Sequence, residues 1–478
     1  MRVLLCLVFV VVGALSCSDE VTDLSSDYNE ENDLIKTGGK YDTGYYSSLA
    51  AELEGTYSSR LQLDVTDLSE SERQAYLVES VSDTNKLQTI AQEQVRLSKR
   101  QLGDKLLHLN LTKGDMVMGD IALVNLEERV LLQAEFSVNV ELLVTVKELV
   151  DTNTTMDELV GTTHKITVAG DPRELLYRAE ETCASGHTAG HLYDSNYFYY
   201  FDPTAESCSL PMIEATFVVN RLLATAETYP EYDRLTEDGK VELGIIFGAA
   251  ETVPYDGDWG VMMWRTYHTN LRLAGYDEVI RERGRVYTRT IDGLTEEIEL
   301  YSPYDLHELG THSVSELLVQ LLQSKEIIAY NGHSFYGSLD VLQHRENYPE
   351  DRYQILFMNS CWSYEYYTKQ VFANKATEQD PTGWLDVDVV NNTQPAYFTH
   401  MEGSTRKLVT NLMAGARSGG ADDQGRRYSW QNIIGILNDE SRGVCPEDAD
   451  PMDCRHYQET NRHEIYGVSG STTNLYLP

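Results

Sequence analysis

Two short runs of consecutive apolar residues mark the second half of the chain. Ile327–Tyr330 leads to His333, and Ile355–Met358 leads to Cys361. Runs of this length without polar alternation predict strands that are buried on both faces, as in a parallel sheet. Because neighbouring parallel strands end at the same edge of a sheet, we expect His333 and Cys361 to lie together where open α/β sheets carry ligand chemistry.

Helices and further strands are predicted around these runs. Val241–Phe247 predicts a strand, Asp258 can cap a helix that extends to about Leu273, and Asp292–Gly293 indicates a hairpin turn. A stripe of leucines predicts a helix that begins near Ser313. Further strands are predicted at Leu385–Val390 and Pro395–Phe398, and further helices at Arg406–Met413 and Trp430–Leu437. The order of elements predicts an α/β domain over residues 236–478, with a mostly parallel sheet covered by helices.

The first half of the chain alternates apolar and polar residues instead. This pattern is typical of half-buried strands and occurs in Ser59–Val65, Val130–Val146, Lys165–Val168 and Ala215–Val219. Several short strands separated by polar turns predict an antiparallel, sandwich-like, β-rich domain over residues 45–235. Apart from one group of cysteines and histidines considered below, no residue pattern in this domain indicates a reaction or a ligand.

The N-terminus has the features of an export signal. Arg2 precedes an apolar stretch, Val3–Leu15, that is shorter than the roughly 20 residues needed to span a bilayer. Small residues followed by Cys17 resemble a bacterial lipobox, so residues 1–16 are expected to be a signal peptide and Cys17 the acylated residue. Ordinary cleavage after Ser16 is the alternative. Residues 17–44 are acidic and lack apolar periodicity, which predicts a disordered tether. We therefore expect an exported protein of the bacterial cell envelope, anchored in the outer membrane or located in the periplasm or at the cell surface.

The net negative charge of the chain argues against some classes of binding partner. Its 478 residues include 76 acidic and 38 basic ones, for a formal net charge of −38. Such a chain repels nucleic acid and anionic lipid headgroups. We therefore expect a protein or peptide substrate, no nucleic acid, and contact with a membrane only through the N-terminal lipid. The acid excess also fits a salty habitat or calcium binding.

The chain has seven cysteines, which divide into pairs and single residues. In an exported protein, two local disulfides are expected, Cys183–Cys208 and Cys445–Cys454. With Cys6 in the signal peptide and Cys17 acylated, Cys361 is the thiol left over, which indicates a reactive role. The alternative is an inert, buried cysteine that packs like a small apolar residue.

Two other groups of residues are compatible with metal binding. Cys183, His187, His191 and Cys208 would provide zinc ligands, although the glycine-rich segment between them is a poor helix. Glu447–Asp453 is an acidic loop that would suit calcium, although it lacks the EF-hand pattern. A disulfide and a solvated loop explain these residues more simply. We therefore assign no metal ligand and expect no cofactor, with calcium as the remaining option.

The two strand ends resemble the signature of the clan CD cysteine peptidases, which include caspases, gingipains, clostripain, legumain and separase. Their shared pattern is an apolar strand that ends in His-Gly, followed by an apolar strand that ends in a small residue and Cys. The corresponding stretches are Ile327–Ser334 and Ile355–Cys361, and the resemblance covers about residues 236–400. Two departures are Ser334, where these peptidases usually have Gly, and Ser360, where many have Ala. The whole chain is also similar to a group of Gram-negative bacterial lipoproteins that share the stretch Tyr330–Ser334.

The resemblance implies a caspase-like fold and a role for each residue of the site. Cys361 would attack the scissile carbonyl as a thiolate, which the start of a helix in the aromatic-rich segment Trp362–Phe372 would favour. His333 would protonate the leaving amine and then activate water. The backbone N–H groups of Ser334 and Cys361 would bind the oxyanion. Ser334 has the required N–H, but it is strained if the family's glycine adopts an unusual φ.

These expectations lead to one main hypothesis and two alternatives. The main hypothesis is an exported, lipid-anchored, caspase-like cysteine endopeptidase with a Cys361–His333 dyad. The first alternative is a catalytically silent, caspase-fold surface lipoprotein that acts as a binding module, and the second is a zinc hydrolase built on His187 and His191. In the peptidase, Asp256 or Asp258 would suit a basic substrate residue, although Asp258 is better explained as a helix cap.

Overall fold

The structure, a computed structural model, describes residues 45–98, 106–145, 160–173, 175, 183, 201–206, 208–223, 227–309, 313–334, 339–350, 352–394, 396–441 and 465–470. The expected signal peptide, the tether and the lipid site at Cys17 lie outside these residues, as do Cys445 and Cys454. Within the described part of the chain, no helix is long and apolar enough to cross a bilayer.

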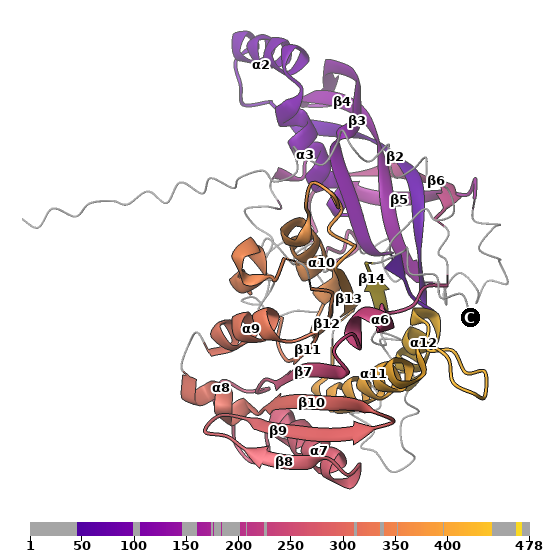
Figure 1. The fold of residues 1–478 in the computed structure, drawn as a ribbon. Helices are drawn as coiled ribbons and strands as arrows, with labels where there is room; N and C mark the ends of the chain where they lie inside the picture. The colour runs from indigo at the N-terminus through magenta and orange to yellow at the C-terminus, as the bar shows by residue number, and fades with distance from the viewer. Residues whose placement is uncertain are drawn as a thin grey trace, which may run out of the picture. The chain divides into compact units, whose positions relative to one another are not determined.

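A nine-stranded mixed sheet organises the second half of the chain, with the strand order β1-β14-β13-β12-β11-β7-β10-β9-β8 (Figure 1). Its strands are β1 (Tyr45–Tyr46), β7 (Lys240–Phe247), β8 (Asp277–Ile280), β9 (Arg285–Ile291), β10 (Leu294–Tyr301), β11 (Ile327–Asn331), β12 (Gln354–Asn359), β13 (Val387–Asn392) and β14 (Tyr466–Ser469). The strands β10, β7, β11, β12 and β13 are parallel to one another. Antiparallel pairing is confined to the two ends of the order. The expected parallel pairing of the two apolar runs is confirmed, because they form β11 and β12.

Helices cover both faces of this sheet. On one face pack α7 (Trp259–Leu273), α11 (Phe398–Ser418) and α12 (Trp430–Ser441); on the other pack α8 (Pro303–Leu309), α9 (Ser313–Ser324) and α10 (Ser363–Lys375). The short elements are α6 (Tyr232–Leu235) and the 3-10 turns η4 (Asp340–Gln343) and η5 (Arg345–Asn347). Side chains of β11 alternate, so that Ile327 and Ala329 join one apolar cluster while Ile328 and Tyr330 join the other. Burial on both faces explains the unbroken apolar runs.

Most elements expected in this half of the chain are confirmed, and one is wrong. The β9–β10 hairpin turns at Asp292 and Gly293, whose φ angles are 53° and 86°. Asp258 is the N-cap of α7, as expected. The strand expected at Pro395–Phe398 is not formed, because Phe398 is the first residue of α11. A stretch of four residues is too short for its apolar pattern to distinguish a strand from a helix.

A second sheet contains the strands of the first half of the chain, in the order β3-β4-β2-β6-β5, and all of its pairs are antiparallel as expected. Its elements are β2 (Ala50–Asp64), β3 (Leu106–Leu126), β4 (Arg129–Thr145), β5 (Thr163–Ala169) and β6 (Met212–Leu222), with helices α2 (Glu70–Ser82) and α3 (Asn85–Arg96). A sandwich would place a second sheet against this one. In the described residues, the helix α3 packs against the apolar core of the sheet instead, through Leu87, Ala91 and Val95. These residues repeat every four positions and form one helix face, a narrow signal in an otherwise polar segment.

Between the described strands, the chain passes from one sheet to the other at two places. The first is between β1 and β2, where residues 47–49 separate a strand of the nine-stranded sheet from a strand of the five-stranded sheet. The second is between the end of β6 at Leu222 and the start of β7 at Lys240. Tyr229, Tyr232 and Leu235, which precede β7, already belong to the apolar core of the nine-stranded sheet.

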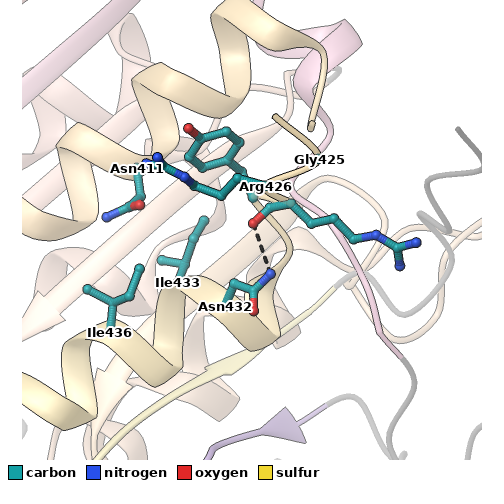
Figure 2. A pocket seen from close by; sticks show the side chains of 8 residues that line it. Asn411, Gly425, Arg426, Asn432, Ile433 and Ile436 are labelled. Atoms are coloured by element: carbon teal, nitrogen blue, oxygen red, sulfur yellow. Dashed lines mark hydrogen bonds between the residues drawn. The ribbon is translucent and has the colours of Figure 1, made fainter. Parts of the chain in front are cut away.

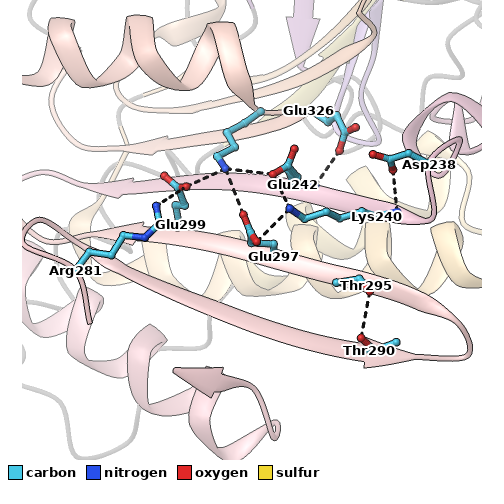
Figure 3. A network of polar contacts seen from close by, with 10 residues as sticks. Asp238, Lys240, Glu242, Arg281, Thr290, Thr295, Glu297, Glu299 and Glu326 are labelled. Carbon is cyan, nitrogen blue, oxygen red and sulfur yellow. Dashed lines mark hydrogen bonds and ion pairs between the residues drawn. The ribbon is translucent and has the colours of Figure 1, made fainter. Parts of the chain in front are cut away.

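A row of charged residues connects β7, β10 and the start of β11 (Figure 3). The strand register places Glu242 opposite Glu297, an arrangement that would be repulsive by itself. Lys240 Nζ lies 2.8 Å from Glu242 and 3.1 Å from Glu297. Lys325, only 5% exposed, lies 3.0 Å from Glu299 and within 4 Å of the other two glutamates. The lysines therefore offset the repulsion between paired carboxylates.

The surroundings of Glu326, the last residue before β11, oppose the ionisation of its carboxyl group. Its pKa is raised from 4.5 to about 7, first by burial and then by the carboxylates of Asp238 and Glu242, while the Glu242 N–H, which donates to it at 2.8 Å, acts in the opposite direction. A raised pKa means that the folded state holds the proton more tightly than the unfolded state does. The stability contributed by the protonated form is therefore lost as the pH rises from 4.5 through about 7.

We predict that Glu326→Gln removes this pH-dependent loss. The amide oxygen still accepts from the Glu242 N–H, and the side chain can no longer ionise. The free energy of unfolding of the variant minus that of the wild type should increase between about pH 5 and about pH 8. Urea denaturation at several pH values in this range measures the difference.

Glu316, an exposed residue of α9, provides the matched control. Glu316→Gln makes the same chemical change on the surface, so its stability difference should stay flat over the same pH range. An equally flat difference for Glu326→Gln would show that the folded state does not oppose its ionisation.

Candidate active site

The residues of the expected dyad lie where two neighbouring parallel strands end. In the register of β11 and β12, Asn331 is paired with Asn359. The Gly332 N–H donates to the Asn359 carbonyl oxygen at 3.3 Å, which continues the pairing by one residue. His333 and Cys361 each follow their paired asparagine by two residues and leave the sheet at the same level. The structure thus places both at the one edge expected from the sequence, and their catalytic roles stay a prediction.

A buried network of neutral side chains holds the two strand ends together. Asn359 Nδ2 donates to Asn331 Oδ1 at 2.8 Å and to Ser404 Oγ at 3.0 Å. Thr405 Oγ1 donates to Asn331 Oδ1 at 2.7 Å, and the Tyr466 hydroxyl donates to Asn359 Oδ1 at 3.1 Å. All five residues are nearly inaccessible to solvent. The network connects β11, β12, α11 and β14 directly beneath the dyad.

The ring of His333 is held by the backbone of the loop after β7. Its Nε2 atom lies 3.0 Å from the Ala250 carbonyl oxygen, and the Phe398 ring meets it edge-on with 5.1 Å between ring centroids. A carbonyl oxygen only accepts hydrogen bonds, so Nε2 carries the proton and the lone pair of the neutral ring lies on Nδ1. The residue is exposed and is therefore accessible to a substrate.

Asp258 fixes the loop that contains Ala250. Its Oδ1 accepts from the N–H groups of Gly260 at 2.7 Å, Val261 at 3.2 Å and Ala250 at 3.1 Å. Its Oδ2 accepts from the Glu251 N–H at 2.9 Å. The residue is 1% exposed. Its role as a helix cap is confirmed, and this buried carboxylate is occupied by backbone groups rather than open to a basic substrate residue.

Asp256, the other acidic residue considered for a basic substrate, is bound by groups of the protein itself. Arg265 forms an ion pair with it at 2.6 Å, and the Tyr304 hydroxyl donates to it at 2.9 Å. The hydrogen bond from Arg265 lowers the pKa of this carboxyl below its ordinary value. A basic substrate residue would therefore have to compete with Arg265 for Asp256.

Cys361 carries a thiol that is not part of a disulfide. The Ala396 N–H donates to its sulfur at 3.4 Å, and the Ala396 carbonyl oxygen lies 3.7 Å from the same atom. The donated N–H stabilises a thiolate more than a thiol, because the charged sulfur is the stronger acceptor, whereas the carbonyl oxygen can accept only from the protonated thiol. The helix expected in Trp362–Phe372 is confirmed as α10, and its N-terminus begins two residues after Cys361. The positive end of the helix dipole adds to the stabilisation of a thiolate.

The turn between Cys361 and α10 is conformationally strained. Trp362 has φ 46° and ψ 33°, the left-handed region that L-residues adopt at a cost of roughly 1–2 kcal/mol. Its N–H donates to the Gln394 carbonyl oxygen at 3.0 Å, which holds the turn against the loop after β13. Strain of this kind persists only where the surroundings determine the backbone, as at functional sites.

The backbone of Ser334 does not adopt a strained conformation, although serine stands where the family that the chain resembles usually has glycine. It is not among the described residues with positive φ, and it is buried. The Tyr330 hydroxyl donates to the His333 carbonyl oxygen at 2.8 Å, and the Tyr367 hydroxyl donates to the Ser334 carbonyl oxygen. Burial raises the pKa of both tyrosines, so they stay protonated and act as donors. The peptide group that contains the Ser334 N–H is therefore held from behind by Tyr330.

Gly332 is needed for this arrangement because of a close approach. A Cβ atom at this position would lie 2.8 Å from the Tyr330 hydroxyl oxygen, which is closer than real Cβ contacts. The tyrosine turns back beneath the strand end to reach the His333 carbonyl, and glycine leaves room for it.

Sequence reasoning missed the supporting groups. Ala250 and Ala396 act through backbone atoms, which carry no sequence signal. Tyr330 lies within the apolar run and looks like an ordinary core residue, and Tyr367 lies on the helix after Cys361. Asn331 and Asn359 were visible as the polar residues that end each run, and this was the one available signal of the buried network.

The expected disulfide between Cys183 and Cys208 is confirmed. Both sulfurs are therefore unavailable as zinc thiolates, which removes half of the four-residue zinc alternative. His187, His191 and the acidic loop Glu447–Asp453 lie outside the described residues. Among the residues that are described, no group of three or more His, Cys, Asp or Glu side chains is arranged to hold a metal ion.

An open cavity of about 400 Å³ lies between α11 and α12 (Figure 2). Its cationic residues are engaged, because Arg427 lies 3.0 Å from Glu227 and Arg426 lies 3.6 Å from Asp422. The lining contains no histidine, cysteine or carboxylate, and the hydroxyl of its one tyrosine, Tyr428, donates to Asp422 at 3.2 Å. The residues that line the cavity are Asn411, Gly425, Arg426, Arg427, Tyr428, Asn432, Ile433 and Ile436.

We predict that Asn359→Leu loosens the strand ends without changing either residue of the dyad. It removes the bonds to Asn331 and Ser404 and the bond that the Tyr466 hydroxyl donates to Asn359. Loss of a buried polar partner costs about 1–3 kcal/mol, so the free energy of unfolding should fall by roughly that amount. Chemical denaturation gives the value.

Asn85→Leu, on the exposed start of α3, is the control and should change stability by less than about 0.5 kcal/mol. A stability loss for Asn359→Leu no larger than that of the control would contradict the structural importance of the amide pair.

Comparison of the chain with models of protein families, with curated proteins and with solved structures finds no match. The functional assignment therefore depends on the residues and on the geometry described above.

Proposed function

We propose that the chain is an exported, lipid-anchored, caspase-like cysteine endopeptidase that uses Cys361 and His333. The observation that carries the proposal is the register of β11 and β12, which brings an imidazole and a thiol to one level of one sheet edge. A thiol beside an imidazole is a nucleophile with a proton carrier. The parallel strands β7, β11, β12 and β13, with helices on both faces, are compatible with the caspase-like fold that the sequence resembles.

In the first half of the proposed reaction, the Cys361 sulfur attacks the carbonyl carbon of the scissile peptide and forms a C–S bond. The backbone N–H groups of Ser334 and Cys361 bind the resulting oxyanion, and one such donor typically contributes about 3 kcal/mol. His333 takes the thiol proton and passes it to the leaving nitrogen. The C–N bond then breaks, which releases an amine and leaves a thioester on Cys361.

In the second half, His333 takes a proton from water while the oxygen attacks the thioester carbon. The C–S bond breaks, the sulfur regains a proton from His333, and a carboxylic acid is released. No metal or other cofactor enters either half of the proposed reaction. The proposed substrate is a protein or peptide, reached from a lipid anchor at Cys17.

A caspase-fold binding module without catalysis is the second proposal. Ser334 at the usual glycine position favours it, as does a five-stranded sheet in which the sequence shows no chemistry. The binding module and the peptidase differ in one expected outcome: if the chain is a binding module, a Cys361→Ala variant would keep whatever phenotype the protein has.

We predict that iodoacetamide modifies Cys361 in the native full-length protein and that His333→Ala slows the modification. Removal of the imidazole removes the proton acceptor that favours the thiolate, so the rate at about pH 6.5 should fall on the order of tenfold, the equivalent of one pKa unit. Peptide mapping by mass spectrometry identifies the modified cysteine and gives its rate.

His344→Ala is the matched control, because His344 is an exposed histidine in the connection between β11 and β12. It should leave the rate unchanged. Equal rates for the wild type and for His333→Ala would mean that the imidazole does not assist the thiol.

We predict that the wild-type protein cleaves members of a diverse peptide library and that Cys361→Ala does not. Removal of the nucleophile from a dyad of this type should lower the rate by at least about 10³-fold. Circular dichroism confirms that the variant is folded. An inactive wild type would favour the binding module, and an active Cys361→Ala would contradict both the nucleophile and the proposed mechanism.

A further inference from the structure

One peptide group connects a buried carboxylate to the candidate catalytic histidine. The peptide between residues 250 and 251 contains the Ala250 carbonyl and the Glu251 N–H. The N–H donates to Asp258 Oδ2 at 2.9 Å, and the carbonyl oxygen lies 3.0 Å from His333 Nε2. Asp258, a peptide and an imidazole are thus joined in series.

The charge of Asp258 polarises this peptide, with the negative end of the peptide dipole toward His333. A carboxylate that accepts from the N–H side of a peptide draws the hydrogen toward itself, which makes the carbonyl oxygen on the other side more negative. Chains of hydrogen bonds strengthen one another in this way by roughly 10–30% per bond. Because Asp258 is 1% exposed, water screens its charge weakly. The Ala250 carbonyl should therefore accept from an imidazole N–H more strongly than an ordinary carbonyl does.

The start of the loop that contains this peptide is also held in place, by contacts of Gly248 with β11 and with α7. The Gly248 N–H donates to the Asn331 carbonyl oxygen at 2.7 Å, which ties the start of the loop to the end of β11. A Cβ atom on Gly260 would lie 1.9 Å from the Gly248 carbonyl oxygen, so the first turn of α7 presses against the same loop. These contacts fix the backbone of the loop two residues before the peptide, and the bonds from the Ala250 and Glu251 N–H groups to Asp258 fix the peptide itself.

We propose that Asp258 is a positioning residue for His333 and acts through the Ala250–Glu251 peptide. It selects the tautomer with the proton on Nε2, so that Nδ1 carries the lone pair that takes the thiol proton. It also stabilises the imidazolium that forms when that proton arrives, since the carbonyl in contact with the ring is made more negative. The inference rests on the proposed function, because this positioning matters only if His333 transfers protons.

The competing explanation is that Asp258 only caps α7. The two explanations can be tested separately, because the carboxylate uses different oxygens for the helix and for the Glu251 N–H. Oδ1 accepts from Gly260 and Val261, the helix N–H groups, and from the Ala250 N–H, which belongs to the peptide before the one that contacts His333. Oδ2 accepts only from Glu251 among the hydrogen bonds found for the described residues. Asp258→Asn keeps one oxygen for the helix and places an NH₂ group opposite the Glu251 N–H. Asparagine is as good an N-cap as aspartate, so the variant removes the link to the peptide and retains the cap.

The test uses the full chain with ¹⁵N-labelled histidine, in which the His333 signal is assigned by its loss in His333→Ala. At about pH 8, where an ordinary histidine is neutral, the wild type should show the Nε2–H tautomer. Asp258→Asn should show a mixture of both tautomers, and iodoacetamide should modify its Cys361 roughly twofold more slowly, a smaller loss than for His333→Ala, because some of the rings keep the productive tautomer. Asp256→Asn, on the same loop but without contact to this peptide, should match the wild type in both measurements.

Unchanged tautomers and an unchanged rate in a folded Asp258→Asn would overturn the positioning role, whether or not the protein cleaves peptides. A shifted tautomer in a protein that cleaves no peptide would support the positioning role and overturn the proposed function. If Asp258→Asn does not fold, Asp258→Ser serves instead, because serine also caps helices but lacks the second oxygen that reaches Glu251. The same tautomer shift is expected for it, and its absence would overturn the proposal.

Discussion

The hydrogen bond between the side chains of Asn331 and Asn359 is the interaction on which the arrangement of the site depends. It joins the last residues of β11 and β12, which are also paired in the strand register. A slip of one residue would turn every side chain of a strand to the opposite face and separate the two amides. With the amides together, His333 and Cys361 leave the sheet at one level, and the loops after β7 and β13 approach them from either side.

Backbone groups contribute as much to this site as side chains do. The peptide before Ser334 is bound at its carbonyl by Tyr330, and the peptide after Ala250 is bound at its N–H by Asp258. In each case one end of a peptide is anchored in the interior while the other end faces the candidate chemistry. Peptide groups anchored in this way need little reorganisation when charge develops, which is the condition for strong electrostatic stabilisation.

Local patterns in the sequence predicted the parts of the fold that depend on local patterns. The apolar runs before His333 and Cys361 predicted β11 and β12, and Asp258 predicted the start of α7. The contacts of Ala250 and Ala396 were beyond prediction, because any residue supplies the same backbone atoms. The helix α3 was missed because its apolar face has few residues, and the strand assigned near Phe398 was wrong because four residues carry too little periodicity.

The absence of net charge in the Asn331–Asn359 network has a consequence for a chain of charge −38. Ions screen exposed charges over a Debye length of about 8–10 Å at moderate ionic strength, and they leave buried dipoles almost unaffected. In the proposed peptidase, the excess of acidic residues would control the approach of charged peptides, so that their encounter rate would depend on salt. The amides beneath the dyad hold the same geometry in dilute and in concentrated salt. For the proposed substrates, ionic strength would therefore act on the rate of encounter and leave the geometry of the strand ends unchanged.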